Sequence, residues 1–290
     1  MTEYIPPLLA LFAAFLFAVG GQFQGLGVQT LDSRTGAAIS IVFSALMYWI
    51  VAPIFMDWSY WLHPVVLVFA AVGLFRPALS ANLSVIGIRY LGPTLASTLA
   101  STSPLWGLVL GIFLLGEHLT PATALGTAGI VAGVFLLSRR GNLSTHSWPL
   151  WALLFPLGAA MLRAAAHVLS KFGMEFIPDP YFATLVGFTV SAVIATGARF
   201  VKKVDAPFVW NASGPRWFAF AGLAFGFAVL CLNQALLLGE VVTVVPIIAA
   251  APIFSMILSL VIFRREVLTA KIALAVLIVC ASVALIAFYR

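Results

Sequence analysis

Apolar runs of about 20 residues recur along the whole chain, and each is long enough to cross a hydrocarbon core of about 30 Å as a helix. Lipid offers no hydrogen-bond partner to a backbone amide or carbonyl, so a spanning chain must form a helical bundle or a closed barrel. Strand-like alternation of polar and apolar residues is absent, which leaves the bundle. Only 8% of the residues are charged, against roughly 25% in soluble domains. The sequence therefore predicts an all-α membrane protein with no soluble domain.

The apolar runs divide into ten expected transmembrane helices joined by short loops. They cover residues 5–30, 35–55, 64–88, 93–116, 121–138, 148–174, 181–201, 215–238, 242–263 and 270–289. Most basic residues fall at one face of this arrangement, namely Arg34, Arg89, Arg139, Arg140, Arg199, Lys202, Lys203, Arg216, Arg264, Arg265 and Lys271. The positive-inside rule then places both termini outside the cytoplasm. The net charge of +6 thus reports topology, and we expect a multi-pass protein of the cell membrane, or of the inner membrane in a bacterium, in contact with lipid and not with nucleic acid.

A motif of the first half recurs in the second half at a constant offset of 149 residues. The segments "LLGEHLTPATAL" and "IFRREVLTAKIAL" share five aligned pairs, Glu117/Glu266, Leu119/Leu268, Thr120/Thr269, Ala124/Ala273 and Leu125/Leu274. Each copy follows an apolar helix with an internal proline, Pro104 or Pro252. Two five-helix repeats, residues 1–141 and 147–290, are the economical interpretation. Because five is odd, the second repeat enters the membrane from the opposite side, so the prediction is two inverted repeats, an arrangement that favours alternating access.

Glu117 has a structural interpretation and a functional one. Thr120 can cap the following helix through its side-chain oxygen, with Pro121 at the first helical position. Glu117 would then lie in the hairpin before that helix, near the positive N-terminal end of the helix. Thr269 and Glu266 could act in the same way in the second half. The structural interpretation is favoured, and the alternative is a role in proton coupling or gating.

Several motifs resemble those of the ten-helix, EamA-type members of the drug/metabolite transporter superfamily. The matching features are "YLGPTLAST", the mid-helix Pro104 with Glu117 of "GEHLTP" thirteen residues later, the terminal "GIVAGVFLLSRR", and a weaker second-half copy of the first two. The resemblance spans nearly the whole chain. It implies two five-helix repeats and transport of a small molecule, and it favours export.

Two arginines fall about midway along expected helices, Arg76 on the third and Arg163 on the sixth. An arginine at a helix centre costs roughly 2.5–3.5 kcal/mol on insertion scales, so it usually faces a water-filled cavity or a partner. All nine acidic residues lie in or beside expected loops, so neither arginine has an obvious acidic partner. Arg163 begins a polar stripe at helical spacing that continues with His167, Ser170, Lys171 and Met174. One turn from Arg163, His167 is a candidate substrate ligand or proton carrier.

Other polar side chains could converge with these residues on one central cavity. The candidates for substrate binding are Arg76, Arg163, His167, Gln22, Ser101, Asn233 and Gln234. Serine and threonine in membrane helices more often serve packing and interhelical hydrogen bonds. Pro104 and Pro252 each remove a backbone hydrogen bond, to Ala100 and Ile248 respectively, and could act as hinges or as static bends.

The favoured function is a secondary transporter, in the direction of export, of a small polar metabolite. An anionic or zwitterionic substrate such as an amino acid or organic acid would supply the negative charge that the arginines lack, with the proton as a possible coupling ion. One alternative is a proton-coupled drug exporter, although such proteins usually need a buried carboxylate. A non-transporting scaffold or sensor is the other.

An enzyme is not expected, because the sequence contains no nucleophile motif, metal cluster or cofactor fingerprint. No Walker motif is present either, so coupling to ATP is not expected. The two cysteines, Cys231 and Cys280, fall inside expected helices, where free thiols are favoured over a disulfide or a metal pair. We therefore expect neither a cofactor nor a bound metal.

Overall fold

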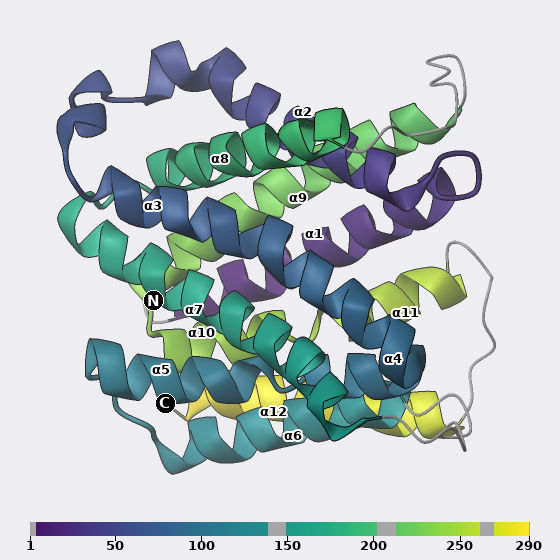
Figure 1. Ribbon diagram of the computed structural model, residues 1–290. Helices are drawn as coiled ribbons and strands as arrows, with labels where there is room; N and C mark the ends of the chain where they lie inside the picture. The colour runs from purple at the N-terminus through teal and green to yellow at the C-terminus, as the bar shows by residue number, and fades with distance from the viewer. Residues whose placement is uncertain (1–3, 139–148, 202–212, 262–269, 290) are drawn as a thin grey trace.

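A computed structural model describes residues 4–138, 149–201, 213–261 and 270–289, and the regular elements of this part of the chain are all helices, with no strand. Its elements are α1 (Ile5–Gly27), α2 (Ser33–Phe55), η2 (Trp58–Leu62), α3 (Val66–Gly73), η3 (Leu74–Leu79), α4 (Ser80–Ala100), α5 (Ser103–Leu115), α6 (Pro121–Ser138), η4 (Leu150–Leu153), α7 (Leu154–Phe176), α8 (Pro180–Val201), α9 (Ser213–Leu238), α10 (Val241–Ile248), α11 (Ala251–Val261) and α12 (Ala270–Phe288). They form one bundle with both termini at the same end (Figure 1).

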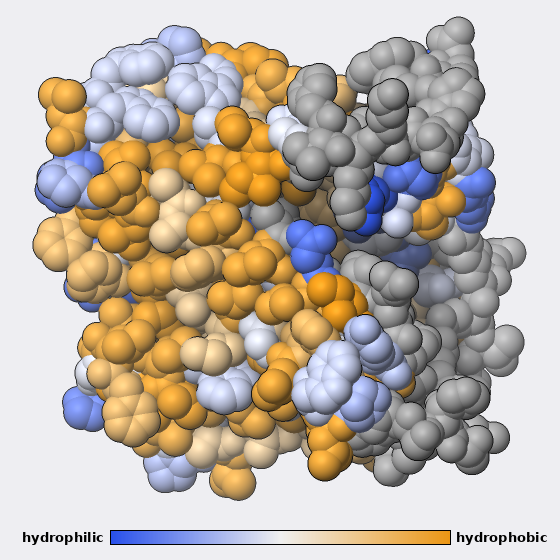
Figure 2. Space-filling view, in the orientation of Figure 1, coloured by the Kyte–Doolittle hydropathy of each residue, from blue (hydrophilic) through white to orange (hydrophobic). Residues whose placement is uncertain are grey.

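The helices have the length and the apolar surface of membrane spans. Six helices in the described part are long and apolar enough to cross a bilayer, and shorter apolar helices fill the remaining passages. Side chains such as Ile50, Ile54 and Phe113 are more than 70% exposed, which suits lipid contact. Figure 2 shows apolar residues over most of the described surface on one face. The predicted all-α membrane bundle is confirmed.

The packing of the helices repeats between the two halves of the chain. α4 of the first repeat packs on α7 of the second, and the equivalent pair is α9 of the second repeat on α1 of the first. Likewise α5 on α7 corresponds to α11 on α1, and α3 on α8 corresponds to α9 on α2. The pairs α2 with α8 and α6 with α12 join equivalent helices of the two repeats, and α5 with α10 joins the two broken spans. This pattern is that of a pseudo-two-fold axis, and it confirms the two inverted five-helix repeats.

The start of α6 follows the predicted cap. The side-chain oxygen of Thr120 accepts a hydrogen bond from the backbone N–H of Thr123 at 3.2 Å, which satisfies one of the amide groups that an α-helix leaves open at its N-terminus. Pro121 is the first residue of α6, where its missing N–H does no harm. The corresponding prediction for Glu266 and Thr269 lies outside the described residues.

The third span is not the continuous helix that we expected over residues 64–88. Arg76 leaves helical geometry, with φ −135° and ψ 124°, and separates α3 from α4 through η3. Pro77 follows directly, and the ring of a proline pushes the preceding residue out of the α region. The hydroxyl of Ser191 on α8 donates to the freed carbonyls of Gly73 at 2.7 Å and Arg76 at 3.2 Å. The break is thus stabilised from a neighbouring helix.

Two further spans are broken where a bend was expected. The expected helix 93–116 ends at Ala100 and restarts at Ser103, and the helix 242–263 ends at Ile248 and restarts at Ala251. Pro104 and Pro252 therefore lie in the first turn of α5 and α11, where a proline costs no hydrogen bond. The boundary expected at residues 89–92 lies inside α4. The prolines mark complete interruptions at equivalent places in the two repeats.

Candidate functional site

The two equivalent helix breaks border a shared cavity of about 510 Å³, which we call the repeat-interface cavity. Residues from both repeats line it: Ala100, Ser101, Ser103, Pro104, Ile130, Val131, Val134, Arg163, His167, Val245, Ile248, Ala249, Pro252 and Met256. Interrupted helices near mid-membrane leave backbone groups and helix ends free to meet a ligand. The N-terminal ends of α5 and α11, which carry partial positive charge, both lie at this cavity.

Arg163 reaches from α7 to the break between α4 and α5. One guanidinium nitrogen lies 3.3 Å from the carbonyl oxygen of Ala100 and the other lies 3.4 Å from the hydroxyl of Ser84. In a continuous helix the Ala100 carbonyl would accept from residue 104, but Pro104 has no N–H. Arg163 therefore supplies the donor that the proline removes. Within the described part of the chain, its recorded partners are neutral and none is a carboxylate.

Arg76 contacts His167, which lies on the same helix as Arg163. A guanidinium nitrogen of Arg76 is 3.3 Å from Nδ1 of His167. Arginine has no acceptor, so Nδ1 must be unprotonated for this to be a hydrogen bond. The guanidinium also lies 5.8 Å from the ring centre of Phe17, within the range of a cation–π interaction. The geometry orients both side chains, and the proton-carrier role of His167 remains a prediction.

Arg76 lines a different cavity from Arg163, a phenylalanine-lined cavity of about 380 Å³. Its lining is Phe17, Gln24, Ala37, Ser40, Ile41, Ser44, Val72, Arg76, Ala166, Ser170, Ala183, Thr184, Gly187, Phe188, Ser191, Phe225, Val229 and Asn233. Asn233 is buried there and donates to the hydroxyl of Thr184 at 2.8 Å. The expected single central cavity is thus two cavities, with the contact between Arg76 and His167 linking them.

The structure separates the seven predicted site residues by place. Arg163, His167 and Ser101 line the repeat-interface cavity, whereas Arg76 and Asn233 line the phenylalanine-lined cavity. Gln22 lines neither, because its side chain donates to the backbone oxygen of Ser255 at 2.8 Å and to its hydroxyl at 3.0 Å. Gln234 is half-buried on α9 and also lies outside both linings. Gln22 therefore joins α1 to α11 rather than facing either cavity.

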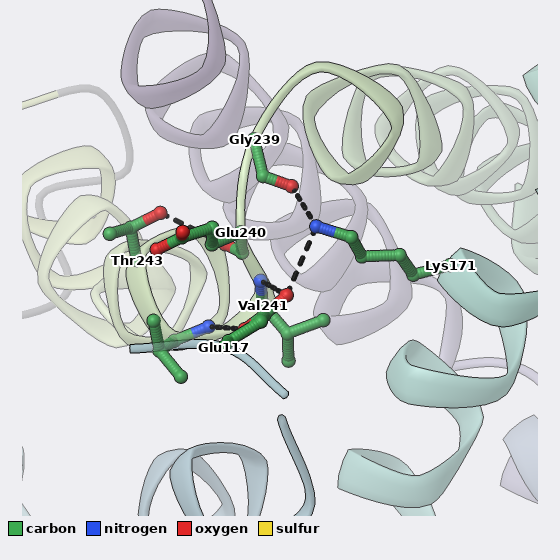
Figure 3. A network of polar contacts seen from close by, with 7 residues as sticks. Glu117, Lys171, Gly239, Glu240, Val241 and Thr243 are labelled. Carbon is green, nitrogen blue, oxygen red and sulfur yellow. Dashed lines mark hydrogen bonds and ion pairs between the residues drawn. The ribbon is translucent and has the colours of Figure 1, made fainter. Parts of the chain in front are cut away.

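Glu117 lies at a helix N-terminus as expected, but the helix is α10 and not α6. Its two carboxylate oxygens accept from the backbone N–H groups of Val241 at 2.8 Å and Val242 at 2.9 Å. Lys171 of α7 completes the network, with its ammonium 3.0 Å from Glu117 and 2.6 Å from the carbonyl oxygen of Gly239 (Figure 3). A carboxylate is favoured at this position by both the lysine and the helix dipole. The sequence pattern alone could not reveal a partner 124 residues away.

The turn that aims Glu117 at α10 is local. Gly116 ends α5 in the left-handed region at φ 66°, which glycine adopts without a steric penalty. The chain then reverses, and the N–H of Glu117 bonds to the carbonyl of Gly111 at 3.2 Å. Gly111 also makes room, since a Cβ there would stand 2.9 Å from a carboxylate oxygen of Glu117. The "LLGE" sequence thus encodes both the helix end and the direction of the carboxylate.

Groups for metal or cofactor chemistry are sparse. Among the described residues, no three His, Cys, Asp or Glu side chains are close enough together to hold a metal ion. Cys231 and Cys280 are free thiols. The arginine, histidine and serine side chains that line the two cavities therefore supply charge and hydrogen bonds, which suits the binding of a ligand.

Comparisons with known proteins agree with this architecture. The model of the EamA-like transporter family matches residues 5–139 and again residues 150–288, one match for each repeat. A protein of known crystal structure is 19% identical, and the alignment covers 98% of this chain and 99% of that chain with a TM-score of 0.75; at this identity it shows the fold alone. No curated protein matches. Since the family matches cover nearly the whole chain, this multi-pass membrane protein belongs to the EamA-like transporter family.

Proposed function

We propose that this transporter moves a small metabolite bearing a carboxylate or phosphate through the repeat-interface cavity by alternating access. The observation that carries the proposal is Arg163, a cation about midway along α7 whose recorded partners are a hydroxyl and a backbone carbonyl. A buried charge without a counter-charge is costly. A substrate anion would supply that counter-charge on binding.

The surroundings of Arg163 favour an anion over a cation. The planar guanidinium offers donors in a fork that matches a carboxylate or phosphate. The N-terminal ends of α5 and α11 add partial positive charge at the same cavity. Broken helices whose N-termini meet an anionic group recur in transporters built from inverted repeats. Amino acids belong to this class as well as organic acids, because both carry a carboxylate that the guanidinium can bind.

Export across the cell membrane, with the termini outside the cytoplasm, completes the proposal. The direction rests on the family resemblance and the orientation on the distribution of basic residues. Proton-coupled export of cationic drugs is less well supported. It requires a carboxylate free to bind cation and proton in turn, whereas buried Glu117 is held by Lys171 and the N-terminus of α10.

Flux from proteoliposomes tests the proposal. Proteoliposomes that contain the purified protein would be loaded with radiolabelled leucine, succinate or glycerol 3-phosphate, which represent zwitterions, carboxylates and phosphates. We expect efflux of at least one class, and Arg163→Ala should lower it by about a hundredfold, equivalent to about 2.7 kcal/mol of lost binding to the transported species. Arg163→Lys should retain part of the flux because the charge remains.

The matched control is Gln234→Ala, a polar residue of α9 that lies outside both cavity linings. It should transport at the native rate. A protein that moves none of the three classes would support the scaffold or sensor alternative. Native flux in Arg163→Ala would remove Arg163 from the site and overturn the proposal.

A further inference from the structure

Three basic residues lie on one face of α7, and they reach beyond the two cavities of the site. Arg163, His167 and Lys171 are spaced by four residues, which is about 6 Å along a helix per step. The first two line the repeat-interface cavity. Lys171 lines a third space, a terminal cavity of about 480 Å³ whose lining is His118, Thr120, Thr123, Lys171, Leu237, Leu238, Gly239, Glu240 and Thr243.

The terminal cavity and the repeat-interface cavity follow one another along the same two helices. α7 contributes Lys171 to the terminal cavity and Arg163 to the other. α10 contributes Thr243 to the terminal cavity, and Val245 and Ile248 to the other. The terminal cavity is the one of the two that lies nearer the end of the bundle that carries both termini (Figure 1).

The Glu117 network borders the terminal cavity, because Lys171 and Gly239 both line that cavity. Glu117 belongs to the first repeat, whereas Lys171 and the N-terminus of α10 belong to the second, so the network ties the two repeats together (Figure 3). Glu117 is only 8% exposed. Alternating access moves one repeat relative to the other, and such a movement toward this end would have to separate these partners.

We propose that Glu117, Lys171 and the N-terminus of α10 form the gate of the transport route at this end, and that Lys171 is a second anion site. Glu117 occupies that site in the closed state. A substrate carboxylate or phosphate takes its place during passage, so that the lysine exchanges one anion for another and does not lose its counter-charge. The proposal rests on the proposed function for the substrate class, but the existence of the gate can be tested without transport.

The gate is tested by the accessibility of the repeat-interface cavity. In a background of Cys231→Ala and Cys280→Ala, the reporter Ile248→Cys would be labelled with a membrane-impermeant maleimide added on the side of the termini. We expect slow labelling in the native gate. Glu117→Gln should accelerate it about tenfold, because the amide cannot pair with Lys171, and Lys171→Met should do the same. Lys171→Arg should restore slow labelling.

Glu175→Gln is the matched control, an exposed carboxylate near the same end of α7 that is not part of the network. In the Glu175→Gln variant, the cysteine at position 248 should be labelled at the same rate as with the native gate. If Glu117→Gln and Lys171→Met both remain folded, as judged by size-exclusion chromatography, and are labelled no faster than Glu175→Gln, the network is a static structural contact. That result would refute the gate.

The anion site is tested with the same reporter. Leucine, succinate and glycerol 3-phosphate would each be added during labelling of the protein with a native gate, with glucose as the neutral comparison. At least one of the three should change the labelling rate by about threefold or more, and Lys171→Met should abolish this response. If only glucose, or none of the compounds, has this effect, Lys171 is not an anion site.

The gate and the proposed substrate class can fail separately. If Glu117→Gln is labelled faster but the native protein shows no flux of the three substrate classes, the gate is supported and the proposed substrate class is rejected.

Discussion

Arg163 and Glu117 are both charged residues held among membrane helices, but their surroundings differ. Glu117 has a complete set of partners, with one lysine and two backbone N–H groups around its two oxygens. Arg163 has a hydroxyl and a carbonyl at 3.3–3.4 Å and lines an open cavity. A charge with complete partners holds a structure in one state, whereas a charge that lacks a counter-ion is available to a ligand. The following substitutions test that contrast.

Glu117→Ala should have the largest effect on stability. It would leave Lys171 without its anion and the N–H groups of Val241 and Val242 without acceptors. Removing one partner of a buried pair costs about 3–5 kcal/mol. The midpoint of thermal unfolding in detergent should fall accordingly, and Glu175→Ala, at an exposed carboxylate, should stay within about 0.5 kcal/mol of the native protein. Equal midpoints for the two variants would show that the partners of Glu117 contribute little.

Ser191→Ala should have an intermediate effect at the third helix break. The hydroxyl of Ser191 is buried and donates to the carbonyls of Gly73 and Arg76. Its loss leaves two acceptors without that donor, which costs about 1–3 kcal/mol. Thermal unfolding would be compared with Thr196→Ala on the same helix, since within the described residues the Thr196 hydroxyl donates to the backbone of its own helix. If both variants lost the same stability, the break at Arg76 would not depend on Ser191.

Gly116→Ala should have a smaller effect through the turn that directs Glu117. An alanine in the left-handed region costs roughly 1–2 kcal/mol relative to glycine. The control is Gly21→Ala, at a helical glycine where an added Cβ meets nothing within 4 Å, and it should be neutral or slightly stabilising. A loss of stability in the control but not in Gly116→Ala would contradict the assigned conformations.

The parts of this molecule that the sequence predicts are those with local causes. The Thr120 cap and Pro121 act within one turn of helix, and the span lengths follow from hydropathy, so both could be read from the chain. The break at Arg76 also has a local cause in Pro77, but the apolar pattern continues through it and led us to expect one helix. The breaks at Pro104 and Pro252 were expected as bends because the sequence shows the lost hydrogen bond but not the extent of the interruption.

The interactions that the sequence could not predict join distant segments. The partner of Glu117 lies 124 residues away, and nothing in either segment specifies the other. The division of the polar residues between two cavities depends on the directions of the packed helices, so Gln22 could not be assigned to Ser255 beforehand. The sequence predicts that Arg163 has no acidic partner. It does not predict that the guanidinium donates to the Ala100 carbonyl, the backbone group that Pro104 leaves free.

Arg163→Met should have the smallest effect on stability and a large effect on transport. Methionine is unbranched and adaptable and can fill the space of the aliphatic stem. It removes a partly buried charge whose recorded partners are neutral, and because Ala100 lines the open repeat-interface cavity, water can replace the guanidinium as donor to its carbonyl. The unfolding midpoint should therefore correspond to a change within about 1 kcal/mol, while efflux falls about a hundredfold. A loss of stability as large as that of Glu117→Ala would mean that Arg163 mainly holds α7 to the end of α4, and the contrast between the two charges would not hold.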